Sequence, residues 1–226
     1  MRRVAPVLLL LAASCATTPP EVGEPGAELP DPRAEERYQA ALRRATEHRE
    51  VYSDLDTKFY VAATYQSADF REARLRRQAQ FQTWPPERLA QAIARERTEA
   101  SQVHEIAFGV MIVDRRFDDL DSRNSVWRLT LVTDQGEVSP LAIRRVGRAN
   151  QDLRAYYPYL GDFWTLYTVR FPIAVQGRPL VSPSTSALLF RMSSTQGQVE
   201  MRFPVASATA TGPSMPVVPP SPPPTR

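Results

Sequence analysis

Between residues 103 and 205 the chain is built largely of short segments in which apolar and polar residues alternate. Alternate side chains of a strand point to the same face, so a period of two predicts strands with one buried face. The predicted strands are 57–66, 103–113, 126–133, 138–146, 163–173, 187–193 and 198–205. Short strands with frequent turn residues between them predict an antiparallel β-sandwich, most closely immunoglobulin-like, with a small barrel as the alternative.

Two of these segments predict where the sandwich is most buried. Segment 103–113, VHEIAFGVMIV, is almost continuously apolar, which favours a central strand covered on both faces. In segment 163–173, alternation places Phe163 and Tyr167 toward the core and leaves Trp164 on the other face. Trp164 is therefore a candidate surface contact for a sugar or a peptide, although large aromatic side chains mostly serve burial.

Helical periodicity appears before and within the β-rich part. Residues 33–56 place Tyr38, Leu42 and Tyr52 near the spacing of one helix face, which predicts one helix over this segment. Ser67 is a candidate cap for a helix that begins at Ala68, and a second helix follows Pro86, so 68–101 predicts a helical hairpin between two strands. The expected fold class is mainly β with helical additions (α+β).

The N-terminus has the order of a secretory signal peptide. Arg2 and Arg3 are followed by an apolar run, by small residues and then by Cys15, the one cysteine of the chain. The apolar run is too short to span a bilayer as a mature helix. Residues 1–14 are therefore predicted to be a signal peptide.

The residues Leu11-Ala12-Ala13-Ser14-Cys15 resemble the lipobox of bacterial lipoproteins. That family prefers Leu three residues before the cysteine, where this chain has Ala12. The resemblance implies lipid on the Cys15 thiol and cleavage just before it; a secreted protein cut by the ordinary signal peptidase is the alternative. By the same resemblance, Ala16 after the cysteine implies the outer membrane, with the domain facing the periplasm or the cell surface.

Amino-acid composition divides the rest of the chain into a tether, a folded domain and a tail. Residues 15–32 are polar and rich in Pro, Gly and Glu, which predicts a disordered tether from the lipidated Cys15, and residues 207–226 predict a Pro-rich tail. One β-sandwich domain is expected over 33–206. Removing Arg2 and Arg3 from the net charge of +3 leaves +1, which is too small a field to recruit nucleic acid.

No catalytic motif is recognisable, and no cofactor, metal or catalytic residue is predicted. The two histidines, His48 and His104, lie in different predicted elements. Asp119, Asp121 and Asn124 could offer oxygen atoms to Ca²⁺, but their spacing does not match an EF-hand, and a solvated turn is the preferred interpretation.

A short basic run lies in the first helix of the hairpin. Arg71, Arg74, Arg76 and Arg77 could contact anionic lipid, although an ordinary solvated helix face is the simpler interpretation. The sequence therefore predicts a membrane-anchored, non-enzymatic lipoprotein, a structural or protein-interaction module that binds another envelope protein or supports an assembly. The alternative is a glycan- or lipid-binding module that uses Trp164 or the arginines.

Overall fold

The computed structural model describes residues 31–53 and 56–205 of the chain. The predicted signal peptide, Cys15, nearly all of the tether and the 207–226 tail lie outside these residues. The helices are α1 (Pro32–Ala45), α2 (Ala68–Phe81), α3 (Pro86–Ala100) and α4 (Gln151–Tyr156), with a short 3₁₀ turn at Arg115–Phe117. The strands are β1 (Thr46–Ser53), β2 (Asp56–Tyr65), β3 (Val103–Ile112), β4 (Arg128–Thr133), β5 (Gly136–Val138), β6 (Ala142–Arg148), β7 (Thr165–Pro172), β8 (Ala174–Val175), β9 (Arg178–Pro179), β10 (Ala187–Ser194) and β11 (Gly197–Pro204).

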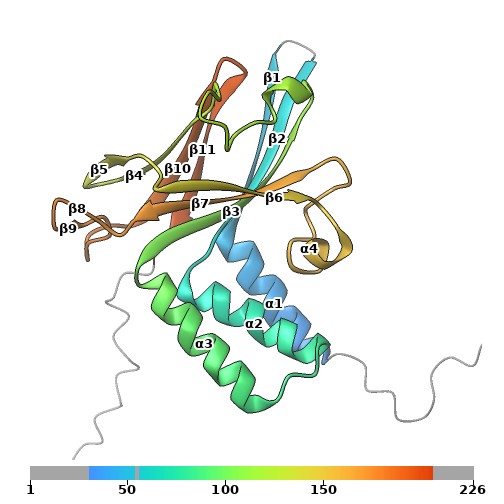
Figure 1. Cartoon of the computed structure of the whole chain (residues 1–226). Coiled ribbons are helices and arrows are strands. Elements are labelled where there is room, and N and C mark those ends of the chain that lie inside the picture. Colours follow the sequence, from blue (N-terminus) through green and yellow to red (C-terminus); the bar gives the residue numbers. More distant parts are fainter. Residues whose placement is uncertain (1–30, 54–55, 206–226) are drawn as a thin grey trace, which may run out of the picture. The chain divides into compact units, whose positions relative to one another are not determined.

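The strands form two antiparallel sheets and a small ribbon. One sheet has the order β1-β2-β3-β7-β6, the other has the order β11-β10-β4-β5, and β8 pairs with β9. The helices α1, α2 and α3 gather at one end of the sheets, and α4 lies beside β6 (Figure 1). The fold is therefore mainly antiparallel β with helical additions, as expected.

The main core lies between the two sheets and follows the alternation of the sequence. The side chains that meet there include Phe59, Val61, Ile106, Phe108, Val110, Trp127, Leu129, Leu131, Tyr167, Val169, Phe171, Phe190, Met201 and Phe203. As the sequence predicts, β3 is central in its sheet and buried on both faces. A second cluster covers the outer face of that sheet with Tyr38 and Leu42 of α1, Phe70 of α2 and Leu160.

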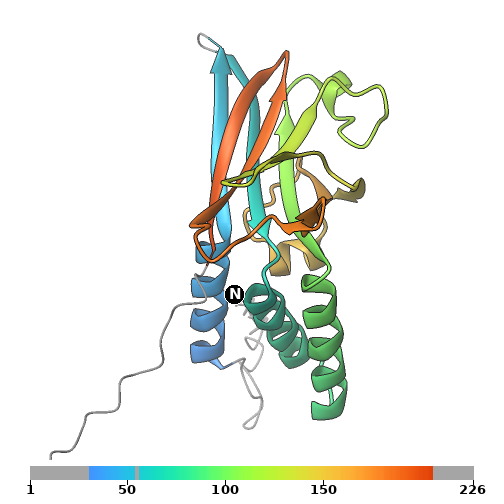
Figure 2. The same ribbon diagram turned by 90° about the vertical axis from the view of Figure 1, so that its left-hand side faces the viewer.

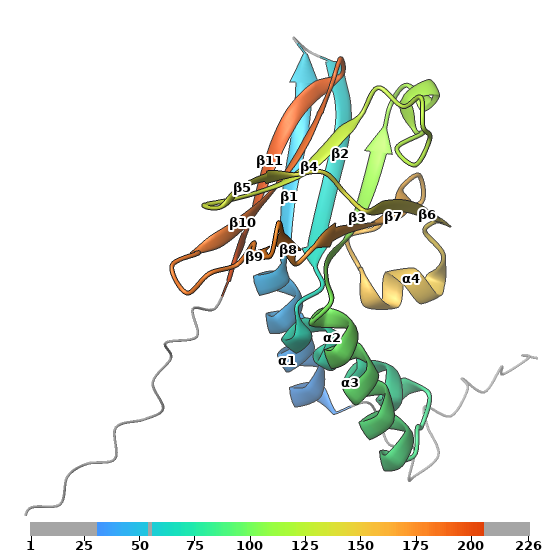
Figure 3. The ribbon, with the colours of Figure 1, turned by 60° about the vertical axis from the view of Figure 1, so that its left-hand side comes forward.

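The predicted helical hairpin is confirmed. It connects β2 to β3 and projects from the ends of these two strands (Figure 3). The Ser67 hydroxyl caps α2 by accepting a hydrogen bond from the Phe70 amide at 3.2 Å. Pro86 opens α3, at a position where the missing amide hydrogen costs nothing.

The prediction of one helix over 33–56 is wrong beyond Ala45. The segment Thr46–Ser53 is strand β1, which pairs along β2, and α1 lies in line with it (Figure 2). The Thr46 hydroxyl lies 2.8 Å from the Thr64 hydroxyl on β2, so pairing with the next strand overrides the local helical spacing. Tyr52, expected on the inner face of a helix, is 55% exposed.

Two further expectations need correction. The predicted return strand 138–146 is split, because β5 pairs with β4 whereas β6 crosses to the other sheet, with Pro140 between them. Phe163 precedes β7 and is 69% exposed, so it does not face the core beside Tyr167.

Candidate interaction groove between α1 and α2

The helix α1 is fixed on the domain by a cap and by two buried side chains. The Asp31 carboxylate accepts a hydrogen bond from the Arg33 amide at 3.0 Å and so caps the first turn. Tyr38 and Leu42, one turn apart, are buried, and the Tyr38 ring lies 6.2 Å from the ring of Phe70 on α2. The Tyr38 hydroxyl donates to the Tyr156 carbonyl, and burial raises the pKa of Tyr38.

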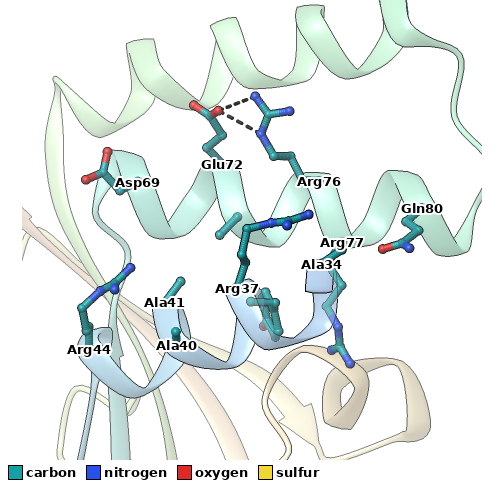
Figure 4. Close-up of a pocket in the computed structure, with 12 residues that line it drawn as sticks. Ala34, Arg37, Ala40, Ala41, Arg44, Asp69, Glu72, Arg76, Arg77 and Gln80 are labelled. Atoms are coloured by element: carbon teal, nitrogen blue, oxygen red, sulfur yellow. Dashed lines mark hydrogen bonds and ion pairs between the residues drawn. The ribbon is translucent and has the colours of Figure 1, made fainter. Parts of the chain in front are cut away.

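An open groove of about 470 Å³ runs between α1 and α2 (Figure 4). Its floor consists mainly of methyl groups, and charged side chains from both helices line its rim (Figure 4). The alanines of the floor are Ala34, Ala40, Ala41 and Ala73. Small side chains let another backbone approach closely, so the shape suits an extended segment or a helix.

The α2 side of the rim is already occupied by ion pairs. Arg76 donates to Glu72 at 2.6 and 3.0 Å, and Arg97 of α3 donates to the same carboxylate at 2.5 Å. Hydrogen bonds from these arginines are the main cause that lowers the pKa of Glu72. Arg77 donates to Glu35 of α1 at 2.8 and 3.0 Å and lies over the Tyr38 ring. These pairs join the helices. Among the charged α2 residues of the lining, only Asp69 has no ion pair within the described residues.

The α1 side of the rim carries cations that remain available. The Arg37 side chain is 70% exposed, and its contact with Asp31, at 3.5 Å, is long. Arg44 is exposed, and it forms no ion pair with any residue in the described part of the chain. The two arginines are seven residues apart on one helix, a rise of about 10 Å. The groove therefore offers two cationic groups along one edge of an alanine floor.

The structure separates the four arginines that the sequence grouped as one possible lipid contact. Arg71 is 3% exposed and donates to Glu96 of α3 at 2.5 Å, and Arg74 donates to the same carboxylate at 3.1 Å. Arg77 is largely buried against α1, so only Arg76 has an exposed side chain. The four therefore do not form a basic surface, because successive helical positions face different neighbours.

Trp164, the other predicted surface contact, is partly covered. It is half-buried in the cluster on the outer face of the five-stranded sheet. A Cβ added at Gly109 of β3 would lie 3.0 Å from the Trp164 ring, which shows how closely the indole covers this glycine. The exposed aromatic is its neighbour Phe163, whose carbonyl accepts a hydrogen bond from Arg115 at 2.9 Å.

The loop 114–124, which holds Asp119, Asp121 and Asn124, is organised by Asp118, a residue that the sequence did not single out. Its carboxylate accepts hydrogen bonds from Thr165 at 2.9 Å, from the Tyr167 hydroxyl at 2.9 Å and from Arg145 at 3.1 Å. Burial is the largest cause that raises the pKa of Tyr167, and the hydrogen bond to the Asp118 carboxylate raises it further. Across residues 31–53 and 56–205, no three His, Cys, Asp or Glu side chains gather in an arrangement that could hold a metal ion.

The two histidines lie far apart in the fold. His48 is exposed on β1, and its ring meets the edge of the Tyr159 ring at 5.5 Å. His104 is buried on β3, and its Nδ1 lies 2.9 Å from the Tyr65 hydroxyl. Burial lowers the pKa of His104. Neither histidine has a serine or an aspartate among its hydrogen-bond partners in the described residues.

Sequence reasoning missed Arg37 and Arg44. A signal for them was present, because Ala34, Arg37, Ala41 and Arg44 follow the spacing i, i+3, i+7, i+10 of one helix face. The spacing points to a groove only because α2 packs beside that face.

Among the described residues, no helix is long and apolar enough to cross a membrane.

No protein-family model and no curated protein matches the chain. A solved structure of a protein of unknown function from Burkholderia pseudomallei aligns with a TM-score of 0.39 and 10% sequence identity, covering 75% of this chain and 83% of that chain. This similarity is too low to transfer a fold or a function.

Proposed function

We propose that the protein is a lipid-anchored lipoprotein of the cell envelope that works without catalysis, as a module that binds a protein partner. The signal-peptide order and the lipobox-like residues before Cys15 support the anchor, and Ala16 supports the outer membrane. Two or three acyl chains, at about 0.8 kcal/mol for each buried methylene, would hold the protein on the membrane for long times.

The α1–α2 groove is the observation that carries the interaction role. Arg37 and Arg44 lie along one edge of its alanine floor, and their guanidinium groups are available to bind carboxylates. The complementary partner is an amphipathic helix that lays small or apolar residues on the floor and presents carboxylates about seven residues apart. A concave alanine floor fits a helix better than it fits a bilayer surface.

The alternative proposal is a glycan- or lipid-binding module. It would need Trp164 or the arginines of α2 as contacts, but Trp164 is half-buried and Arg71 is 3% exposed. Among Trp164 and the four arginines of α2, only Arg76 has an exposed side chain, and it is paired with Glu72. We therefore place the alternative second.

The immunoglobulin-like form of the sandwich stays a prediction. Immunoglobulin domains distribute their strands as ABED and CFG, so that the third strand joins the second sheet. Here β1, β2 and β3 lie side by side in one sheet, which is a different distribution of consecutive strands.

The decisive experiment places a photoactivatable crosslinking residue at Ala41 in the anchored, full-length protein in its own cells. We expect a discrete protein adduct whose crosslinked peptide is helical and carries carboxylates about seven residues apart. The adduct should disappear in the double variant Arg37→Glu, Arg44→Glu. It should persist in Arg33→Glu, Arg43→Glu, which makes the same charge change at exposed positions of α1 that do not line the groove.

Three results would contradict the groove. These are crosslinking to lipid alone, an adduct that survives the change at Arg37 and Arg44, or equal loss in both double variants, which would indicate a general charge effect.

The anchor is tested separately with an alkyne-tagged fatty acid. We expect Cys15→Ala to lose both the label and membrane attachment, and a labelled or membrane-bound variant would refute lipidation at this residue.

A further inference from the structure

A second hollow, of about 560 Å³, lies on another face of α2, beneath the α2–α3 hairpin. Its remaining walls come from α4 and from the outer face of β3, β7 and β6. The space exists because α3 has no buried residue and because short side chains such as Ala107, Ala142 and Thr168 line the sheet below it. The volume falls within the range of about 300–1,000 Å³ that is typical of small-molecule pockets.

The inner wall of this cavity is a fixed network of opposite charges. Arg71 donates to the Gln66 carbonyl at 2.9 Å and to Glu96 at 2.5 Å, and Arg74 donates to Glu96 at 3.1 Å. Desolvation opposes the negative charge on Glu96, but the arginines outweigh it, and the pKa of this carboxyl is lowered. Glu96 is therefore held ionised and already engaged by two cations.

The other two carboxylates of the wall are engaged in the same way. Arg170 of β7 donates to Glu105 of β3 at 2.8 Å and also pairs with Glu99 of α3. The cavity lining contains four arginines and three glutamates, so one arginine is left without a carboxylate partner after these pairs form. The additional arginine is Arg144, which has no ion-pair partner within residues 31–53 and 56–205.

Strand register directs Arg144 into the cavity. It pairs with Thr168 of β7, and both residues line the hollow. The next residue, Arg145, reaches the opposite face and contacts Asp118. The register then shifts at a bulge before Gly147, whose φ of +130° suits glycine.

We propose that this cavity binds a small monocarboxylate with an aliphatic body. The Arg144 guanidinium is matched to a carboxylate, which it can hold through two parallel hydrogen bonds. Val146, which is 39% exposed, and Leu153 supply apolar surface for the hydrocarbon, whereas Ala107 and Leu166 also line the cavity but are buried. Because Glu96, Glu99 and Glu105 already occupy the other arginines, a dianion would leave one negative charge without a partner, so a phosphate monoester is disfavoured.

The test uses the full chain carrying Cys15→Ser, so that no acyl chain competes, and octanoate as the probe. Ligand-observed NMR titration should give a dissociation constant of about 1 mM or lower, a scale set by the few non-hydrogen atoms of the probe. Arg144→Gln should weaken octanoate binding at least tenfold. Arg148→Gln, on the same strand but outside the cavity lining, should leave binding unchanged. Octan-1-ol should bind weakly and equally to all three proteins.

A cavity-filling variant provides an independent check. Ala142 lines the cavity from an exposed edge strand, so Ala142→Trp should keep the thermal unfolding transition and abolish octanoate binding. The proposal is overturned if octanoate does not bind at 10-fold the expected dissociation constant, if Arg144→Gln binds as well as the parent, or if Arg148→Gln weakens binding equally. It is also overturned if octyl phosphate binds more tightly than octanoate.

Discussion

Gly109 tests how closely the outer face of the five-stranded sheet is packed. It lies within β3, opposite Ala62 of β2 and Leu166 of β7. A Cβ at this position would lie 2.2 Å from Leu160 Cδ2 and 3.0 Å from Trp164 Cε3. Contacts this short force both neighbours to move, and the Trp164 ring is rigid.

We expect Gly109→Ala to lower the free energy of unfolding. Overpacking costs about 1–3 kcal/mol, while the loss of glycine freedom in the unfolded chain returns about 0.4–1 kcal/mol. The net cost of about 1–2 kcal/mol corresponds to a fall in Tm of about 2–8 °C for a domain of this size. The assay is urea and thermal unfolding of the full chain carrying Cys15→Ser.

A double-mutant cycle attributes the effect to the contact. Leu160 is 2% exposed, so Leu160→Ala alone should cost about 2–5 kcal/mol. In that background the added methyl group has room, and Gly109→Ala should become neutral or stabilising. A neutral Gly109→Ala in the parent, or an equal cost in both backgrounds, would refute the close packing of β3 beneath Leu160.

Three further predictions concern buried polar groups. Because burial lowers the pKa of His104 below the unfolded value of about 6.5, the unfolding free energy should be lost as pH falls through that value and level off below the folded pKa. Urea unfolding between pH 8 and 5 should show a smaller decline for His104→Gln, and identical slopes would contradict the assignment. Arg71→Met should cost up to about 3–5 kcal/mol in urea unfolding, with part recovered by adding Glu96→Gln, because Arg71 is 3% exposed and the largely covered Glu96 would keep only Arg74 as a partner; a cost below about 1 kcal/mol would refute this. Asp118→Ala removes the acceptor of two hydroxyl groups and a guanidinium and should cost about 1.5–3 kcal/mol by thermal unfolding, whereas Asp121→Ala, in the same loop, should be near neutral.

The helical hairpin was predictable because its signals are local. Ser67 caps α2 through the amide three residues on, and Pro86 opens α3, so each boundary depends on a few consecutive residues. Segment 46–53 was not predictable in the same way. Its spacing is compatible with a helix, and it becomes β1 because β2 supplies the hydrogen-bond partners.

The candidate sites show the same division. Arg71 and Arg76 lie five residues apart on one helix and look equivalent in the sequence, yet one is buried against α3 and the other is exposed. No feature of the neighbouring sequence distinguishes Arg144 from Arg145 or Arg148. Its role depends on strand register, which sends neighbouring side chains to opposite faces of the sheet.

The sequence by itself determined which side chains of most strands face the core, because a period of two is a property of each strand and its own neighbours. It also determined the α+β class and the placement of the hairpin between β2 and β3. Only the tertiary structure decided that β5 and β6 join different sheets, that α1 and α2 enclose a groove, and that Arg144 faces a cavity. These features depend on which distant segments meet, and no short-range pattern encodes that choice.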